Sequence, residues 1–226
     1  MKPRKKIDQT STPNGNDLIL FQHDNDFYMQ VDRHELMSSR RHESELELGR
    51  IGGQQAAQLA SAPVRILIGG LGMGYTLRAT LDLLPPEAEV VVAELLADVV
   101  RWNRDIIGHL AGHPLKDKRV SLQNCNVLKV LQESPNAFDA ILLDIDNGPA
   151  AFSDSANDEL YSEVGIQMIL HALKQQGGLY LWSAGLVRAF ERRLKRAGLK
   201  VKSHKVKAHK HAKKRTHYIV AAYRFS

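Results

Sequence analysis

The segment VRILIGGLGMGYTLRATLDLL, residues 64–84, joins an apolar run to a cluster of four glycines and an amphipathic stretch. Val64–Ile68 has the composition of a buried strand, and Gly69–Gly74 has that of a tight turn. The stretch that follows repeats leucine at i, i+4 and i+7, which puts these side chains on one helix face. The segment therefore predicts a strand, a glycine-rich turn and a helix, with the backbone of the turn open to a close ligand.

The alternation of strand and helix continues toward the C-terminus. Further strands are expected at Val90–Leu95, Val120–Cys125, Phe138–Ile145 and Gly178–Trp182. Further helices are expected at Asp98–Leu110, Val127–Leu131, Tyr161–Leu173 and Leu186–Ala197. No helix separates the last two strand-like runs, Leu199–Val206 and Tyr218–Phe225, so we expect them to form an antiparallel hairpin. The pattern predicts an α/β fold with a Rossmann-like sheet of seven strands, the last one antiparallel.

The N-terminal part has a different character. Residues 1–16 are basic and polar, which suggests a flexible leader. Asp17–Phe21 and Phe27–Val31 are apolar runs around a polar turn, and they predict a β-hairpin. Ser38–Gln58 reads as a helix that Gly52 and Gly53 interrupt. The expected organisation is a leader at 1–16, a small hairpin and helix region at 17–61, and a nucleoside-binding domain at 62–226.

Composition narrows the class of protein. The chain has 226 residues, of which 43% are hydrophobic, enough for one well-buried α/β domain. No stretch has the roughly 20 apolar residues of a membrane span, and Met1–Asp17 lacks the apolar core of a signal peptide. Cys125 is the only cysteine, so no internal disulfide can form. These features favour a cytoplasmic protein with no membrane contact.

An acidic residue follows the second strand at the spacing that nucleoside-binding folds use. Glu94 lies twenty residues after Gly74, where its carboxylate can accept hydrogen bonds from ribose hydroxyls. The loop has the spacing G-G-x-G-x-G, which differs from the G-x-G-x-x-G of NAD-binding loops. Asn126 and Asp144 end the third and fourth strands, at the same edge of the sheet. The alternative interpretation is a tight turn and a solvated carboxylate.

These residues resemble the spermidine-synthase family, and especially its short bacterial spermidine-synthase-like members, from about Asp17 to the end of the chain. The resemblance implies a class I methyltransferase fold and a donor, either S-adenosylmethionine or its decarboxylated form. It assigns donor binding to the loop and to the ends of two strands: Gly69, Gly70, Gly72, Gly74, Glu94, Leu95, Asn126 and Val127. FDAILLD, residues 138–144, is similar to the strand that ends in the family's catalytic aspartate.

Three departures from the family bear on the reaction. Gly72 stands where spermidine synthases have an aspartate that binds the donor's amine, and Asn126 replaces an acid that contacts the adenine. Met37–Arg50 has no clear counterpart of the Asp-Glu pair and aromatic residues that seat putrescine. We therefore expect methyl transfer to an amine-like acceptor slightly ahead of aminopropyl transfer to putrescine or a related polyamine. A non-catalytic module that binds a nucleoside or nucleic acid is a third reading.

Asp144 and Asp146 are the candidate catalytic residues, because a carboxylate can orient an amine and accept its proton. The alternative is that they cap the loop that follows the strand. Asn147 and Tyr161 match the family's acceptor end, although the apolar face of Tyr161 favours core packing. Arg40–Glu45 reads as a solvated helix face, with lining of the acceptor pocket as the alternative. We expect no metal site.

The net charge of +6 arises from one stretch. Residues 200–217 hold eight Lys or Arg, four His and no acidic residue. In the predicted sheet this stretch is the turn between the last two strands, at the same edge as the glycine-rich loop and Asp144. It suggests contact with a polyanion such as nucleic acid, or only improved solubility. The residues concerned are Lys205, Lys207, Lys210, Lys213, Lys214 and Arg215. The sequence leaves open whether the chain forms a homodimer.

Overall fold

A computed structural model describes residues 3–59, 63–145, 159–210, 212 and 216–224. The strands are β1 (Lys5–Ser11), β2 (Asp17–His23), β3 (Asp26–Val31), β4 (His34–Ser38), β5 (Arg65–Gly69), β6 (Glu89–Ala93), β7 (Val120–Gln123), β8 (Phe138–Leu143), β9 (Leu173–Ser183), β10 (Leu199–Val206) and β11 (His217–Arg224). The α-helices are α1 (Glu43–Leu59), α2 (Tyr75–Leu81), α3 (Ala97–Asp105), α4 (Val127–Glu133), α6 (Glu163–Ala172) and α7 (Arg188–Arg196). Two 3-10 helices, η1 (Gly108–Ala111) and η2 (Pro114–Lys116), follow α3. None of the helices among these residues has the length and apolar character that crossing a membrane requires.

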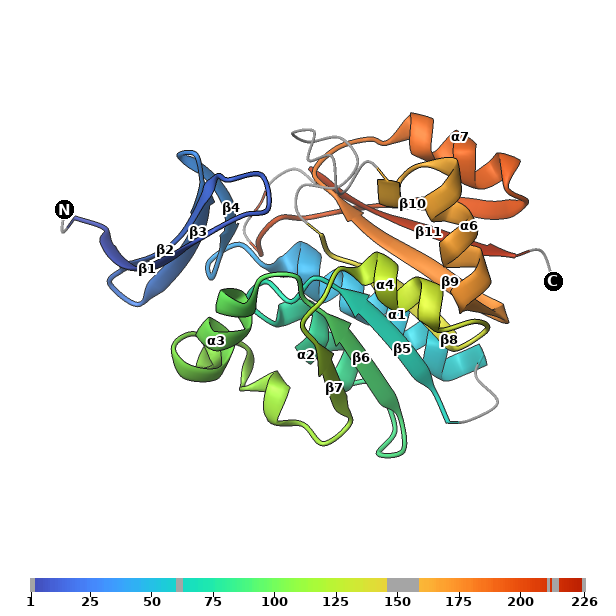
Figure 1. Ribbon diagram of the computed structural model, residues 1–226, viewed down its shortest axis with the longest axis horizontal. Coiled ribbons are helices and arrows are strands. Elements are labelled where there is room, and N and C mark those ends of the chain that lie inside the picture. The colour runs from blue at the N-terminus through green and yellow to red at the C-terminus, as the bar shows by residue number, and fades with distance from the viewer. Residues whose placement is uncertain (1–2, 60–62, 146–158, 211, 213–215, 225–226) are drawn as a thin grey trace.

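The large sheet has seven strands in the order β10-β11-β9-β8-β5-β6-β7 (Figure 1). β5 pairs in parallel with β6 and β8, and β11 runs antiparallel to both β9 and β10. The prediction of a seven-stranded Rossmann-like sheet with an antiparallel last strand is therefore confirmed. β5 is an interior strand, and its Ile66, Leu67 and Ile68 are fully buried, as in a strand that is covered on both faces.

Two apolar layers cover the two faces of this sheet. Leu48 of α1 and Leu77 of α2 pack with Ile66 and Ile68 on one face. Side chains of α4, α6 and α7 pack with Leu67 on the other face. Successive residues of β5 thus enter different layers, as the alternation of side chains along a strand demands.

The N-terminal part is a four-stranded antiparallel sheet in the order β1-β2-β3-β4, which lies beside the large sheet (Figure 1). The expected hairpin is present as β2 and β3, and β4 extends it. The expectation of a flexible leader is wrong for Lys5–Ser11, which forms β1. Pairing with β2 satisfies the backbone groups of this polar segment, and Trp102 Nε1 donates to Asp8 Oδ2 over 2.8 Å.

Helix α1 runs without interruption through Gly52 and Gly53, so the expected break is wrong. The glycines serve close packing. A Cβ on Gly49 would lie 2.5 Å from the backbone oxygen of Thr76, and one on Gly52 would lie 2.8 Å from Leu142 Cδ1. A side chain at either position would force its neighbours to shift, so α1 lies directly against α2 and β8.

Two glycine substitutions in α1 should have opposite effects on stability. Gly49→Ala should lower the free energy of unfolding by about 1–3 kcal/mol, because its new methyl group meets the rigid backbone of α2. Gly53→Ala meets no atom nearer than 3.4 Å and should raise that free energy by about 0.5–1 kcal/mol through helix propensity. Urea unfolding of both variants measures the difference. Equal effects would contradict the packing argument.

Candidate active site

The glycine-rich loop is tied to the strands on both sides of it. Gly70 N donates to Ala93 O of β6 over 2.9 Å, and Asp144 N, just after β8, donates to Gly69 O over 2.9 Å. Gly70 has a φ of +89°, and a Cβ there would lie only 2.3 Å from the carbonyl oxygen of Asp144. Only glycine can occupy this position. The loop therefore exposes backbone rather than side chains at the carboxyl edge of the sheet.

The carboxylate of Glu94 forms a hydrogen bond with the backbone of the glycine-rich loop. Glu94 is 7% exposed; its Oε2 accepts a hydrogen bond from Leu71 N over 2.8 Å, and its Oε1 accepts one from Leu96 N over 2.9 Å. A carboxylate offers about four acceptor sites, so a group of this kind can accept hydrogen bonds from ribose hydroxyls as well as from backbone N–H groups. Leu95 beside it is 43% exposed. Glu94 thus holds the loop in place, and it lies at the position where the sequence predicts a ribose ligand.

Asn126 and Val127 begin α4 at the same edge. Asn126 is the N-cap of the helix, and its side-chain oxygen accepts from Leu128 N over 2.9 Å. Val127 is buried, and its Cγ2 would lie 3.0 Å from a Cβ on Gly69. Sequence reasoning missed Asn124, whose Nδ2 donates to Glu94 O over 2.7 Å. Because its oxygen accepts the capping bond, the N–H₂ group of Asn126 is the part of this amide that can donate.

Met37 of β4 fills the space beside Gly72. A Cβ on Gly72 would lie 2.6 Å from Met37 Cε, and Met73 N donates to Met37 Sδ over 3.2 Å. Gly72 has a φ of +52°, in the left-handed region that favours glycine. The position that carries an aspartate in spermidine synthases thus contains an uncharged thioether from the N-terminal sheet.

Asp144 faces α1 and α2. Thr76 Oγ1 donates to Asp144 Oδ2 over 2.6 Å and lies 3.1 Å from the backbone oxygen of Glu45. Ser44 and Glu45 are buried, so the prediction of a solvated face is wrong for these two residues. They belong to the face of α1 that packs on α2, and the surrounding charges concealed this in the sequence. Glu45 and Asp144 form a pair of acids next to the loop.

Burial and the negative charge of Asp144 raise the pKa of Glu45 to about 8. Ser44 Oγ donates to Glu45 Oε2 over 2.6 Å, which offsets part of this effect. Near neutral pH Glu45 therefore keeps its proton.

The first residue of β11, His217, lies next to Ser44 at the acid pair. His217 Nδ1 lies 3.0 Å from Ser44 Oγ, and the His217 ring packs edge-on against Trp182, with ring centroids 4.9 Å apart. Burial, with a smaller contribution from Arg41, lowers the pKa of His217. The neutral imidazole thus adds no charge beside the acids above pH 7.

The basic turn lies at the same edge, as the sequence predicts. Lys210 Nζ is 4.0 Å from Glu43 Oε1 at the start of α1. Lys205 and Lys207 are exposed. Lys213, Lys214 and Arg215 lie outside the described residues. Positive charge therefore borders the outer side of the site.

The remaining predicted site residues divide into two groups. Asp146 and Asn147 lie outside the described residues. Tyr161 is buried and packs edge-on against Phe190 of α7, with ring centroids 5.3 Å apart. It belongs to the apolar layer on the α4, α6 and α7 face of the sheet.

The sequence model of the family described as "Spermine/spermidine synthase domain" matches residues 54–193. The polyamine aminopropyltransferase of Saccharolobus islandicus (strain L.S.2.15 / Lassen #1) is 30% identical over 121 residues, which cover 54% of this chain and 39% of the relative. That of Saccharolobus solfataricus is 27% identical over the same length and coverage. The matched segment thus spans about two fifths of the length of these relatives.

Solved structures share the fold. Spermidine synthase from Thermotoga maritima has a TM-score of 0.73 and 16% identity, over 96% of this chain and 72% of that one. A spermidine synthase in complex with the transition-state analogue AdoDATO has a TM-score of 0.75 and 16% identity, over 96% and 73% of the two chains. Because the family model covers more than half of the sequence, the chain belongs to the spermine/spermidine synthase family.

Proposed function

We propose that the chain transfers an aminopropyl group from decarboxylated S-adenosylmethionine to an amine acceptor of the polyamine type. The observation that carries this proposal is the acid pair of Glu45 and Asp144 beside the glycine-rich loop. Two neighbouring carboxyl groups favour a ligand that brings positive charge, because each acid opposes ionisation of the other. The curated relatives are named polyamine aminopropyltransferases, which supports the same chemistry.

The loop region fits a nucleoside donor. The loop carries glycine at positions 70 and 72, the Glu94 carboxylate can accept hydrogen bonds from ribose hydroxyls, and Asn126 has an amide N–H₂ group that can donate. These residues would hold the donor. When bound, it supplies a propyl carbon that is activated by a sulfonium leaving group.

The protein's own groups orient the acceptor and take its proton. An amine attacks only after it loses a proton, so a carboxylate near the loop is needed. We assign this role to Asp144, whose orientation Thr76 fixes through a 2.6 Å hydrogen bond. Glu45 is protonated near neutral pH. A cationic acceptor would favour its ionisation and gain a second carboxylate partner. Asp146 and Asn147 stay predictions for the same end of the site.

Methyl transfer is the second candidate function. The observation that favours it is the thioether of Met37 beside Gly72, because within the described part of the chain an uncharged group, rather than a carboxylate that would select an ammonium, contacts this glycine. The sequence reasoning put methyl transfer first on this ground. The acid pair and the family relatives outweigh it, since they concern the acceptor and the transferred group directly.

The two reactions leave different nucleoside products, which makes the test direct. The protein is incubated with putrescine and either S-adenosylmethionine or its decarboxylated form. Aminopropyl transfer releases 5′-methylthioadenosine, whereas methyl transfer releases S-adenosylhomocysteine. We expect methylthioadenosine, and only from the decarboxylated donor. S-adenosylhomocysteine would support methyl transfer instead, and calorimetric donor binding without either product would indicate a non-catalytic module.

Asp144→Asn should lower turnover by roughly 10²–10⁴, because the amide cannot accept the acceptor's proton. Donor affinity, measured by calorimetry, should change little, since the loop and Glu94 are intact. A matched loss of donor affinity and turnover would mean that Asp144 holds the donor instead.

Glu45→Gln should reduce the pH dependence of stability between about pH 5 and 8. Folded Glu45 keeps its proton up to a pKa of about 8, whereas the unfolded side chain is ionised above its ordinary value of 4.5. The unfolded state binds fewer protons, so the free energy of unfolding falls as pH rises, by at most about 1.4 kcal/mol per pH unit. Urea unfolding measures this slope. Glu87→Gln, on an exposed turn, should keep the wild-type slope, and an unchanged slope in Glu45→Gln would contradict the assignment.

A further inference from the structure

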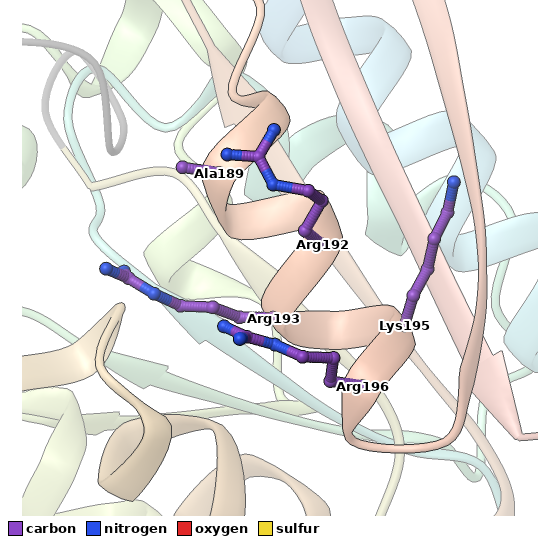
Figure 2. Close-up of a pocket in the computed structure, with 5 residues that line it drawn as sticks. All are labelled: Ala189, Arg192, Arg193, Lys195 and Arg196. Carbon is purple, nitrogen blue, oxygen red and sulfur yellow. The ribbon is translucent and has the colours of Figure 1, made fainter.

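Helix α7 carries a dense positive charge on the side that faces solvent. Its apolar residues Phe190 and Leu194 are buried, which orients the helix on the sheet. Figure 2 shows the four cationic side chains that line a hollow here, Arg192, Arg193, Lys195 and Arg196, projecting from the helix. Arg192, Lys195 and Arg196 are exposed, whereas Arg193 is half-buried and donates from Nη1 to Tyr161 O over 3.0 Å.

Among the residues that the structure describes, acidic side chains neutralise little of this surface. Residues 188–210 contain ten Lys or Arg and a single acid, Glu191. Glu191 Oε1 accepts a hydrogen bond from Ser203 Oγ of β10 over 2.7 Å. The nearest ion pair given by the described residues joins Arg196 to Glu163 over 3.6 Å, and these side chains are 69% and 79% exposed. A pair this exposed contributes little, so the positive charge is available to a partner.

The charge extends from α7 toward the carboxyl edge of the sheet. The contact between Glu191 and Ser203 joins α7 to β10. Lys205 follows Ser203 by two residues, and therefore projects from the same face of the strand. Beyond it, Lys207 and Lys210 belong to the turn at this edge. The cations thus form a band from the C-terminal end of α7 to the rim of the active site.

We propose that this band, named here the α7 surface and centred on Arg192, Lys195 and Arg196, binds the phosphates of a nucleic acid duplex. Guanidinium groups match phosphate oxygens with two parallel hydrogen bonds, and three of the four cations in the hollow are arginines. α7 and β10 contain one Phe, Tyr or Trp, the buried Phe190, and the Tyr218 ring of β11 beside Lys205 is half-buried. Single strands are usually held by exposed aromatic side chains, so a duplex is the better fit.

Two other classes of partner fit the surface less well. Insertion of a helix into a membrane surface requires an exposed apolar face, and the apolar side chains of α7 face the core. The core of a protein–protein interface is depleted of charged residues, whereas this face consists mainly of them. Phosphate contact alone predicts binding that depends on salt and little on base sequence.

The test compares two triple variants with the same change in net charge. Arg192→Gln, Lys195→Gln and Arg196→Gln remove the exposed cations of the α7 surface. Arg104→Gln, Lys118→Gln and Lys129→Gln remove three exposed cations elsewhere on the chain. Binding of a fluorescent DNA duplex of about 20 base pairs is followed by anisotropy from about 50 to 200 mM salt. Circular dichroism verifies that both variants are folded.

We expect the wild type and the control to bind, with the same salt dependence. The α7 variant should bind at least tenfold more weakly at low salt, with the slope of log K against log salt smaller by about 2–3. Four results would overturn the proposal: no duplex binding by the wild type at low salt, equal losses in both variants, tighter binding of the corresponding single strand, or stronger binding to vesicles of anionic lipid.

Discussion

Gly70 lies so close to the end of β8 that the glycine-rich loop and Asp144 cannot move independently. The missing side chain permits a separation of 2.3 Å between the Cβ position of Gly70 and the carbonyl oxygen of Asp144. Hydrogen bonds from the loop to Ala93 and Glu94 extend the constraint to β6. Residues far apart in sequence are thereby held at one edge by backbone contacts. This packing sets the distance between the loop, which is assigned to donor binding, and Asp144, which is assigned to the acceptor.

Helix α1 supplies the acceptor side by the same physical means. Glu45, Gly49, Gly52 and Ala56 recur at i, i+4, i+7 and i+11, so they occupy one buried face of the helix. The two glycines let this face approach Thr76 and Leu142 more closely than any side chain would permit. One turn earlier, Glu45 then lies beside the Asp144 carboxylate and the hydroxyl of Thr76. The close packing of a helix thus brings a second acid into the site.

Local patterns were sufficient to predict the large sheet, because each strand and helix there has its own apolar period. They also predicted Glu94 and Asp144, which follow strands directly. Glu45 entered only through the alternative interpretation of Arg40–Glu45 as lining of the acceptor pocket, because its neighbours at 40–47 are mostly charged and its partner Asp144 lies about a hundred residues later. The glycine and alanine spacing in α1 was the available signal, and it was misread as a break. Contacts between residues that are distant in sequence override local composition, through burial for Glu45 and through strand pairing for β1.

At the carboxyl edge of the large sheet, the exposed lysines and the buried acid pair favour ligands of opposite charge. The exposed lysines of the turn act through solvent, where salt screens their field within about 8–10 Å. Glu45 is 6% exposed, and its interactions are stronger because the surrounding dielectric is low. A small amine therefore meets weak repulsion at the rim and strong attraction at the acid pair. A long polyanion experiences the reverse, since it can follow the α7 surface but cannot bring its phosphates to the carboxyl groups. The same edge can thus admit a cationic acceptor while the outer surface holds an anionic partner.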